Sequence, residues 1–412
     1  MSRRVVITGL GVFSPVGKNP AEFFDNLMAG ISGIGRLQAP FAEKLSIRIA
    51  AQIRDYHPAD HFPKLKLPGI ERFSQFALIA AEQAVRDAQL ELADHELPRA
   101  GVYMGTSMGG AGTLEDGYVE IFQKETPRLR PLSVLLAMNN AAASHLSLTY
   151  RLQGPNITYS TACSSSAIAI GEACRRIRNG CADVMLAGGS EAMLTHGVMK
   201  AWEALQTLAV EDAGDPAASC KPFARDRSGL VLGEGAAMLV LEDAERAVRR
   251  GARIYGEVAG YDCSSDASHI TKPDAAGQAR TMLNALRDAG LQPQDIGYIN
   301  AHGTATQAGD FEETRAIKQV FGDYALRVPV SSTKSMHGHL MGATGAVEFA
   351  AALLALQHNA LPPTINLHQP DPACDLDYVP NTGRRNVELD AVMSNSFAFG
   401  GSNAVLIAKR FA

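Results

Sequence analysis

The sequence lacks the cysteine patterns that bind metals. Its six cysteines are scattered over 412 residues, at positions 163, 174, 181, 220, 263 and 374. No two of them form a C-x-x-C pair, and no cysteine–histidine cluster has the spacing of a zinc site. We therefore expect free thiols, no bound metal and a reducing, cytoplasmic environment.

Long apolar runs and an excess of basic charge are also missing. The first apolar stretch, Val5 to Gly9, is too short for a signal peptide. No run reaches the roughly 18 residues that a membrane span needs. The 38 basic and 43 acidic residues leave a net charge of −5, which argues against a nucleic-acid partner. With 46% hydrophobic residues, the chain can form two large cores or one duplicated globular fold.

One cysteine follows a predicted strand and precedes a predicted helix. The β-rich run from Asn156 to Ser160 leads into Cys163, and apolar residues at helical spacing continue from Ala167 to a stop at Asn179-Gly180. A helix N-terminus offers free backbone N–H groups and lowers a thiol pKa to roughly 3.5–7.5. We therefore predict that Cys163 is a nucleophile; a buried, inert cysteine is the alternative interpretation.

Two glycine-rich motifs suggest other classes of protein. The strand Val5 to Thr8 leads into Gly9-Leu-Gly11, a partial dinucleotide loop without its third glycine, which we interpret as a tight exit from the strand. Gly105-Thr-Ser107-Met-Gly109 matches the G-x-S-x-G motif of α/β-hydrolases. Because further glycines follow where that motif requires a helix, we favour small residues that line a cavity.

The second half of the chain repeats the order of the first. Three pairs of segments correspond: 101–107 with 297–303, the strand and helix around Cys163 with 328–333 and 346–358, and 229–240 with 395–407. The sequence therefore predicts a duplicated βα fold with halves 1–250 and 251–412. Related halves bring equivalent strand ends together, so we expect Cys163 to face His302, Lys334 and His339.

This set of side chains suits one type of chemistry. A thiolate forms a thioester with an acyl group and so divides one difficult step into two. Neutral imidazoles donate hydrogen bonds to a developing enolate or oxyanion. The combination favours carbon–carbon bond formation between thioesters over peptide hydrolysis, which needs a single base.

Four motifs then resemble the β-ketoacyl-acyl-carrier-protein synthases, in the elongating, KAS II-like branch of the thiolase superfamily. They are Thr161-Ala-Cys163-Ser-Ser, Asn300-Ala-His302-Gly-Thr-Ala-Thr306, Lys334 to Gly345 with His339, and Asn395 to Asn403 with Phe399. The resemblance spans Val5 to Ile407. It implies an α/β thiolase-like duplicated βαβαβ fold in five layers, α-β-α-β-α.

The resemblance also implies a reaction. Cys163 takes an acyl chain from the phosphopantetheine of an acyl carrier protein, and malonyl-carrier protein then enters. His302 and His339 support decarboxylation and stabilise the enolate that attacks the acyl-cysteine, while Lys334 organises the site with Glu348. The product is a chain two carbons longer, in a fatty-acid, polyketide or polyene pathway, and no cofactor is required beyond the carrier's own arm.

Further residues receive roles from the same resemblance. The N–H groups of Cys163 and Phe399 form an oxyanion hole, and Phe399, flanked by Gly400, is a mobile gate. Thr304 and Thr306 bind the pantetheine arm.

The acyl tunnel is expected to involve Met108, Met193 and Trp202. From its two methionines we hypothesise a preference for shorter or unsaturated chains. The alternative is that these methionines only fill gaps in the core.

The sequence also allows predictions about binding partners and about rival functions. The usual basic docking stretch is weak here, so we expect Lys64, Lys66 and Arg72 to act with Lys124, Arg128 and Arg130 on an acidic carrier protein. We expect a homodimer, or a heterodimer with a chain-length-factor-like subunit. The rivals are a non-catalytic subunit, which would lack Cys163, a thiolase, which would need a second cysteine near Phe399, and an esterase acting through Ser107.

Overall fold

The computed structural model describes residues 3–412, and ten strands form its main sheet. Their order is β10-β9-β13-β14-β8-β1-β7-β6-β4-β5. The strands are β1 (Val5–Phe13), β4 (Ala100–Gly105), β5 (Asn156–Tyr159), β6 (Val184–Glu191), β7 (Gly235–Asp243), β8 (Gly256–Ser265), β9 (Tyr298–Asn300), β10 (Val330–Ser331), β13 (Ala391–Phe397) and β14 (Ser402–Lys409). Two small sheets pair β2 (Ile34–Arg36) with β3 (Ile49–Ala51), and β11 (Ala360–Leu361) with β12 (Arg384–Arg385).

The main sheet is symmetric about the junction of β8 and β1. From this junction the strands run outward as β1-β7-β6-β4-β5 in one direction and as β8-β14-β13-β9-β10 in the other. Each half has antiparallel pairs near the junction and parallel pairs at its outer end. The corresponding sequence segments fall on the equivalent strands β4 and β9, β5 and β10, and β7 and β14. The predicted duplication is therefore confirmed.

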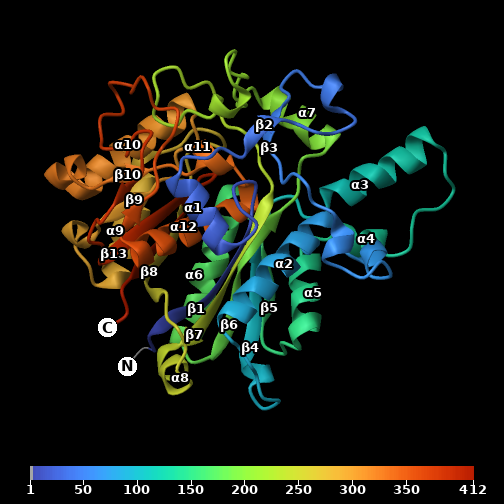
Figure 1. Ribbon diagram of the computed structural model, residues 1–412, viewed down its shortest axis with the longest axis horizontal. Helices are drawn as coiled ribbons and strands as arrows, with labels where there is room; N and C mark the ends of the chain where they lie inside the picture. The colour runs from blue at the N-terminus through green and yellow to red at the C-terminus, as the bar shows by residue number, and fades with distance from the viewer. Residues whose placement is uncertain (1–2) are drawn as a thin grey trace.

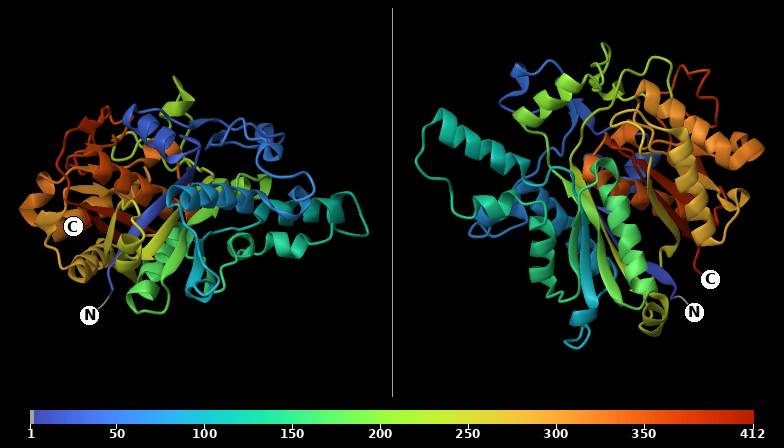
Figure 2. Two further views of the ribbon diagram at one scale, coloured as in Figure 1. Left: turned by 60° about the horizontal axis from the view of Figure 1, so that its bottom comes forward. Right: turned by 180° about the vertical axis from the view of Figure 1, so that it is seen from behind.

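Twelve α-helices accompany the sheet in the described part of the chain. They are α1 (Pro20–Met28), α2 (Arg72–Asp87), α3 (Ala111–Tyr118), α4 (Ser133–Ala137), α5 (Ala141–Tyr150), α6 (Ser165–Arg178), α7 (His196–Leu205), α8 (Ala244–Arg249), α9 (Ala275–Ala289), α10 (Gln307–Phe321), α11 (Lys334–His337) and α12 (Thr344–His358). Helices α6 and α12 lie between the two halves of the sheet, α2 and α5 cover one outer face, and α9 and α10 cover the other (Figures 1 and 2). This is the expected α-β-α-β-α order.

The middle layer is apolar on all sides because a sheet covers each of its faces. Every residue of α12 from Thr344 to Leu356 is buried, and most are alanine, leucine or glycine. Gly171 of α6 faces the ring of Tyr261, where a Cβ would lie 2.2 Å from a ring carbon. Small residues thus let the helices and strands of the middle layer approach closely, and Glu348 on α12 is buried among them.

The first glycine motif has a structural role, so our interpretation of it as a strand exit was wrong. Strand β1 continues through Gly9 and Gly11, and helix α2 packs directly on both. A Cβ on Gly11 would lie 1.8 Å from the carbonyl oxygen of Ala80, and one on Gly9 would lie 2.1 Å from that of Ala84. The glycines therefore permit helix–strand contact.

Two other segments are irregular. The segment 131–152 forms two short helices, α4 and α5. Residues 230–233 pair only through isolated bridges and form no strand of their own.

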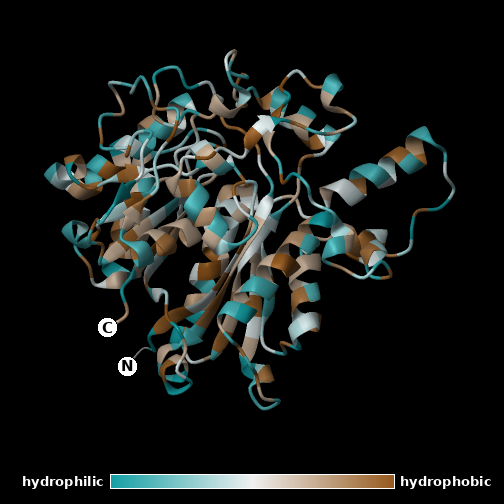
Figure 3. Ribbon diagram, viewed as in Figure 1, coloured by the Kyte–Doolittle hydropathy of each residue, from teal (hydrophilic) through white to brown (hydrophobic). Residues whose placement is uncertain are grey.

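One excursion projects from this layered body. Helix α3, the π-helical turn η5 (Val119–Gln123) and α4 extend away from the sheet on the side of β5 (Figures 1 and 2). Apolar residues occur along it (Figure 3), and several large ones are exposed: Leu114, Tyr118, Phe122, Leu132, Val134, Leu135 and Met138. Strand β5 is the end strand of the sheet, so the open sheet edge and the exposed apolar residues of the excursion lie on the same side of the molecule. Among residues 3–412, no helix is both long and apolar enough to cross a bilayer.

Candidate active site

Cys163 lies where the sequence predicted it, between a strand and a helix. Strand β5 leads into the short 3-10 turn η6 (Ala162–Ser164), and α6 begins at Ser165. Ala162 has a φ of +52°, a left-handed conformation that a non-glycine residue rarely adopts. This sharp turn directs the thiol into the interior, where Cys163 is 4% exposed.

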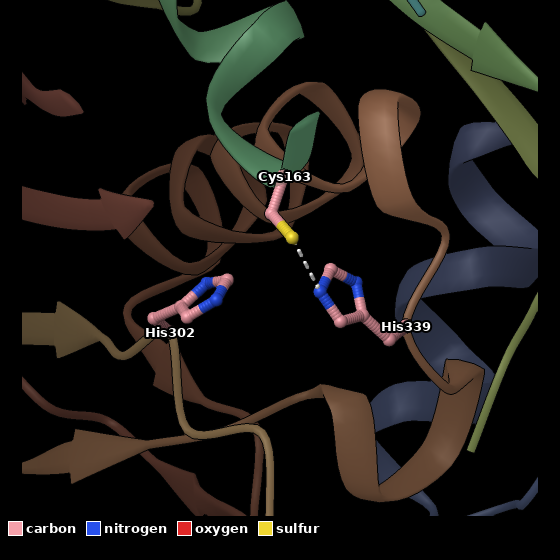
Figure 4. A group of neighbouring side chains, drawn as sticks. All are labelled: Cys163, His302 and His339. Atoms are coloured by element: carbon pink, nitrogen blue, oxygen red, sulfur yellow. Dashed lines mark hydrogen bonds between the residues drawn. The ribbon is translucent and has the colours of Figure 1, made fainter. Parts of the chain in front are cut away.

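The imidazole of His339 points at this thiol (Figure 4). Its Nε2 lies 3.0 Å from the Cys163 Sγ. Its Nδ1 accepts a hydrogen bond from the backbone N–H of Met341 at 3.2 Å and lies 2.9 Å from the Thr344 hydroxyl. A backbone N–H can only donate, so in the neutral ring the proton resides on Nε2 and faces the sulfur.

A buried lysine supports the second histidine. His302 follows β9, and its ring stands at 84° to that of His339, with centroids 5.4 Å apart. The Lys334 Nζ donates to the His302 carbonyl and to Glu348 Oε1, and lies 3.3 Å from the His302 Nδ1. The ammonium therefore places the His302 proton on Nε2, on the side away from the lysine.

Burial and the lysine charge keep both rings neutral. The pKa of His302 and that of His339 are lowered well below the ordinary value, first by burial and then by the Lys334 charge. Burial raises the pKa of Glu348 to about 8, against the opposing effect of Lys334. The site thus offers two neutral N–H donors beside one fixed positive charge, as the chemistry requires.

The thiol pKa differs from the expectation for a helix N-terminus. Burial raises the pKa of Cys163 to about 12, although the Lys334 charge and the N–H groups of Phe399 and Cys163 lower it. The helix end is present, but desolvation of the thiolate outweighs it. The same two N–H groups thus lie next to the sulfur. Their role as an oxyanion hole for a bound acyl group stays a prediction.

A cavity of about 300 Å³ opens onto these groups. Its lining includes Cys163, His302, His339, Thr304, Thr306, Trp202 and Phe399. The hydroxyls of Thr304 and Thr306 lie 2.9 Å apart. The Phe399 ring stacks on Trp202 at 6.0 Å between centroids, and Gly400 beside it has a φ of +85°. Phe399 on a glycine-rich loop and Trp202 of helix α7 therefore close one side of the cavity together.

The remaining expected residues are placed differently. Lys334 lies behind His302 and does not line the cavity, and Met193 is buried in one apolar cluster with Cys163 and Trp202. Met108 is 43% exposed and lies outside the cavity lining. Of the three expected tunnel residues, Trp202 therefore lines the cavity, Met193 packs in the same apolar cluster as Cys163, and Met108 does neither.

The G-x-S-x-G motif has no hydrolase geometry. The Ser107 hydroxyl and N–H both donate to the buried carboxylate of Glu191. A nucleophilic serine would need a histidine partner, so this observation argues against the esterase.

Sequence reasoning missed several buried acids around the site. Glu313 on α10 accepts the N–H groups of His302 and Gly303, each at 2.8 Å, and so shapes the histidine loop. Asp310, one turn earlier, accepts the N–H groups of Ala305 and Phe223. A signal was available, because Asp310 and Glu313 share the helix face that carries apolar Ile317.

A thiol and two imidazoles are also possible metal ligands. Sγ of Cys163 and one ring nitrogen each of His302 and His339 lie within 4.8 Å of one another. The Lys334 ammonium stands 3.3 Å from the His302 ring and opposes a second positive charge there. The absence of a bound metal stays a prediction.

The basic residues expected to dock a carrier fall into two sets. Lys66 and Arg130 line one surface groove together with Leu65 and Leu132, although they are far apart in the sequence. Arg72 instead forms a bidentate pair with buried Glu234, and Lys124 pairs with Glu120. Arg130 also lies 3.9 Å from Asp116, so among these four residues only Lys66 forms no ion pair within the described part of the chain.

Comparison with known proteins agrees with this geometry. The family model "Beta-ketoacyl synthase, N-terminal domain" matches residues 2–247, and its C-terminal counterpart matches residues 255–368. The 3-oxoacyl-[acyl-carrier-protein] synthase 2 of Coxiella burnetii is 43% identical over 410 residues, which are 99% of each chain.

Two solved structures cover all of this chain and match over their own full length. One is a type II PKS acyl-carrier protein in complex with its ketosynthase bound to the hexaketide, with a TM-score of 0.91 and 33% identity. The other is the ishigamide ketosynthase/chain length factor, with a TM-score of 0.92 and 34% identity. The chain belongs to the beta-ketoacyl synthase family.

Proposed function

We propose that this protein is a 3-oxoacyl-acyl-carrier-protein synthase, which joins an acyl group on Cys163 to malonyl-carrier protein with loss of carbon dioxide. The observation that carries the proposal is the buried meeting of Cys163 and His339, 3.0 Å apart, with His302 and the Lys334–Glu348 pair. The chain's relatives support it, since they bear the name of this activity or are ketosynthases.

In the first half-reaction the Cys163 sulfur attacks the thioester carbonyl of an acyl-phosphopantetheine. A carbon–sulfur bond to Cys163 forms, the bond to the pantetheine sulfur breaks, and the proton of the thiol passes to the departing thiolate. The N–H groups of Cys163 and Phe399 stabilise the tetrahedral oxyanion.

In the second half-reaction the malonyl thioester carbonyl accepts hydrogen bonds from Nε2–H of His302 and of His339. The bond to the carboxylate breaks, carbon dioxide leaves, and the electron pair remains as an enolate. The enolate carbon attacks the acyl carbonyl, the bond to Cys163 breaks, and the thiolate takes up a proton. Neutral rings serve this step because they donate to a growing negative charge without losing the proton.

The Thr304 and Thr306 hydroxyls hold the pantetheine arm in the cavity, and Phe399 admits each substrate in turn. The groove of Lys66 and Arg130 offers positive charge to an acidic carrier protein. A resident cofactor has no part in these steps. Free thiols fit a cytoplasmic location.

The open edge of β5 and the exposed apolar excursion favour a dimer. Unpaired edge strands and large apolar patches are typical of surfaces that another subunit covers. We propose a homodimer in which a partner also covers Met108 and closes the acyl tunnel. A heterodimer with a chain-length-factor-like subunit is the alternative, favoured by the similarity to the ishigamide ketosynthase/chain length factor. Light scattering of the protein alone and with candidate partners distinguishes the two.

Incubation with acyl- and malonyl-carrier proteins tests the function. We expect carbon dioxide and a 3-oxoacyl chain two carbons longer, with loss of the longer chain in Cys163→Ala and retention of both products in Ser107→Ala. Intact-mass measurement of Cys163 acylation across chain lengths tests the tunnel hypothesis, which ready loading of a long saturated chain would contradict. Formation of the longer chain by Cys163→Ala would refute the proposed mechanism.

A further inference from the structure

A further buried carboxylate, Glu191, lies near the active site at the end of β6. Glu191 is fully buried, and its oxygens accept five hydrogen bonds. Oε2 accepts the N–H groups of Ser107 and Gly342 and the Ser107 hydroxyl. Oε1 accepts the N–H of Met108 and the hydroxyl of Thr106. Glu191 thus holds two chain segments at once, 106–108 and the turn η10 (Met341–Ala343).

The two segments touch so closely that a side chain cannot stand between them. A Cβ on Gly342 would lie 2.4 Å from the backbone nitrogen of Ser107. Their N–H groups converge in a place that water does not reach, so they need a buried acceptor. The Glu191 carboxylate is that acceptor.

The turn η10 also orients a catalytic ring. The N–H of Met341, the residue before Gly342, donates to the His339 Nδ1 at 3.2 Å. The position of η10 therefore decides whether the Nε2–H of His339 points at Cys163 and the substrate. We propose that Glu191 is a positioning residue, which anchors η10 through Gly342 and so fixes the direction and tautomer of His339.

The five donors suit a carboxylate and no other side chain. Burial raises the pKa of Glu191, and the bonds from Ser107, Met108 and Gly342 lower it. An amide of the same shape has one acceptor oxygen, and its NH₂ must face at least one backbone N–H, which cannot accept. Glu191→Gln therefore preserves volume but loosens one of the two segments.

The test rests on the proposed function and uses the full-length enzyme. We expect Glu191→Gln to lower kcat for carbon dioxide release from malonyl-carrier protein about tenfold with little change in KM, since small misplacements of catalytic groups cost this much or more. In a His339→Ala background the same change should have almost no further effect. Glu71→Gln is the matched control, because Glu71 is a neighbouring carboxylate that only caps α2 through the Phe73 N–H. It should leave the rate close to wild type.

Gly342→Ala provides an independent variant, since its Cβ forces η10 away from Ser107. It should reproduce the loss and the dependence on His339. Equal losses with and without His339 would show that Glu191 acts only on folding and would overturn the proposal.

A readout without turnover separates this proposal from the function. The ¹⁵N shifts of the His339 ring, assigned with His339→Ala, should show an Nε2–H tautomer in wild type and a mixture in Glu191→Gln. If wild type releases no carbon dioxide, the proposed function fails, while an unchanged His339 spectrum in Glu191→Gln refutes the positioning role.

Discussion

The pair of Lys334 and Glu348 allows a prediction with a defined pH dependence. Both side chains are fully buried, and the Nζ also donates to the His302 carbonyl. Burial raises the Glu348 pKa from 4.5 to about 8. The folded state therefore holds a proton that the unfolded state releases above pH 4.5, so the contribution of Glu348 to stability falls as the pH rises toward 8.

Replacement of Lys334 by methionine removes the group that stabilises the Glu348 anion. Below pH 8 the carboxyl keeps its proton in both proteins, and the variant loses only hydrogen bonds, about 1–3 kcal/mol. Above pH 8 wild-type Glu348 ionises beside the lysine, whereas the variant must keep the proton or bury an unpaired charge. The difference in free energy of unfolding should then widen by about 1.4 kcal/mol per pH unit.

Urea titrations at pH 6, 8 and 9 measure this difference. In Lys334→Met/Glu348→Met the widening should vanish, because the titrating carboxyl is gone and two apolar groups replace the pair. Carbon dioxide release should stay low in this double variant, since nothing then holds the His302 loop from the lysine side. A Lys334→Met cost that is the same at pH 6 and pH 9 would refute the reasoning.

Three further predictions concern the reactivity of Cys163, access to it, and binding of the carrier protein. The rate of Cys163 alkylation by iodoacetamide should rise about tenfold per pH unit between pH 7 and 10, because the pKa is about 12; a plateau below pH 8 would contradict this. Trp202→Ala removes the stacking partner of Phe399, so a bulky maleimide should label Cys163 roughly 2- to 10-fold faster, and an unchanged rate would argue against the gate. Lys66→Glu should raise KM for the carrier protein at low salt and leave kcat unchanged, whereas equal KM values at low and high salt for both proteins would exclude electrostatic docking there.

The residues to which we assign the chemistry lie in short motifs that can be recognised in the sequence, and the structure brings them together. Cys163, His302 and Lys334 each come soon after a strand, His339 lies in the same segment as Lys334, and the repeated order of strands implied that these strand ends meet. Asn19-Pro20 is a sequence typical of a helix start, and helix α1 begins there with the Asn19 side chain accepting the Glu22 N–H. Each of these features depends on residues that are close together in the sequence, so it does not require knowledge of the tertiary structure.

Features that depend on three-dimensional neighbours could not be predicted. In the sequence, Gly9 and Gly11 resemble part of a dinucleotide-binding loop. The structure shows that they lie in β1 where helix α2 packs on the strand. The Cys163 pKa depends on how much of the molecule covers the thiol, which the helix start does not reveal. Ser107 belongs to a motif of another enzyme class, and only the position of Glu191 shows that its hydroxyl is already engaged.

In both halves of the fold, a buried acid accepts hydrogen bonds from backbone N–H groups that would otherwise be unpaired, but the two acids lie on different elements. The segment after β4 in the first half corresponds to the segment after β9 in the second, and in each case two consecutive backbone N–H groups turn into the interior. Glu191, at the end of β6, accepts those of Ser107 and Met108, while Glu313, on helix α10, accepts those of His302 and Gly303. In each half a buried acid therefore fixes a loop beside the site. Glu313 holds the loop that carries His302, and Glu191 holds the loop after β4 against η10, whose Met341 N–H bonds to His339.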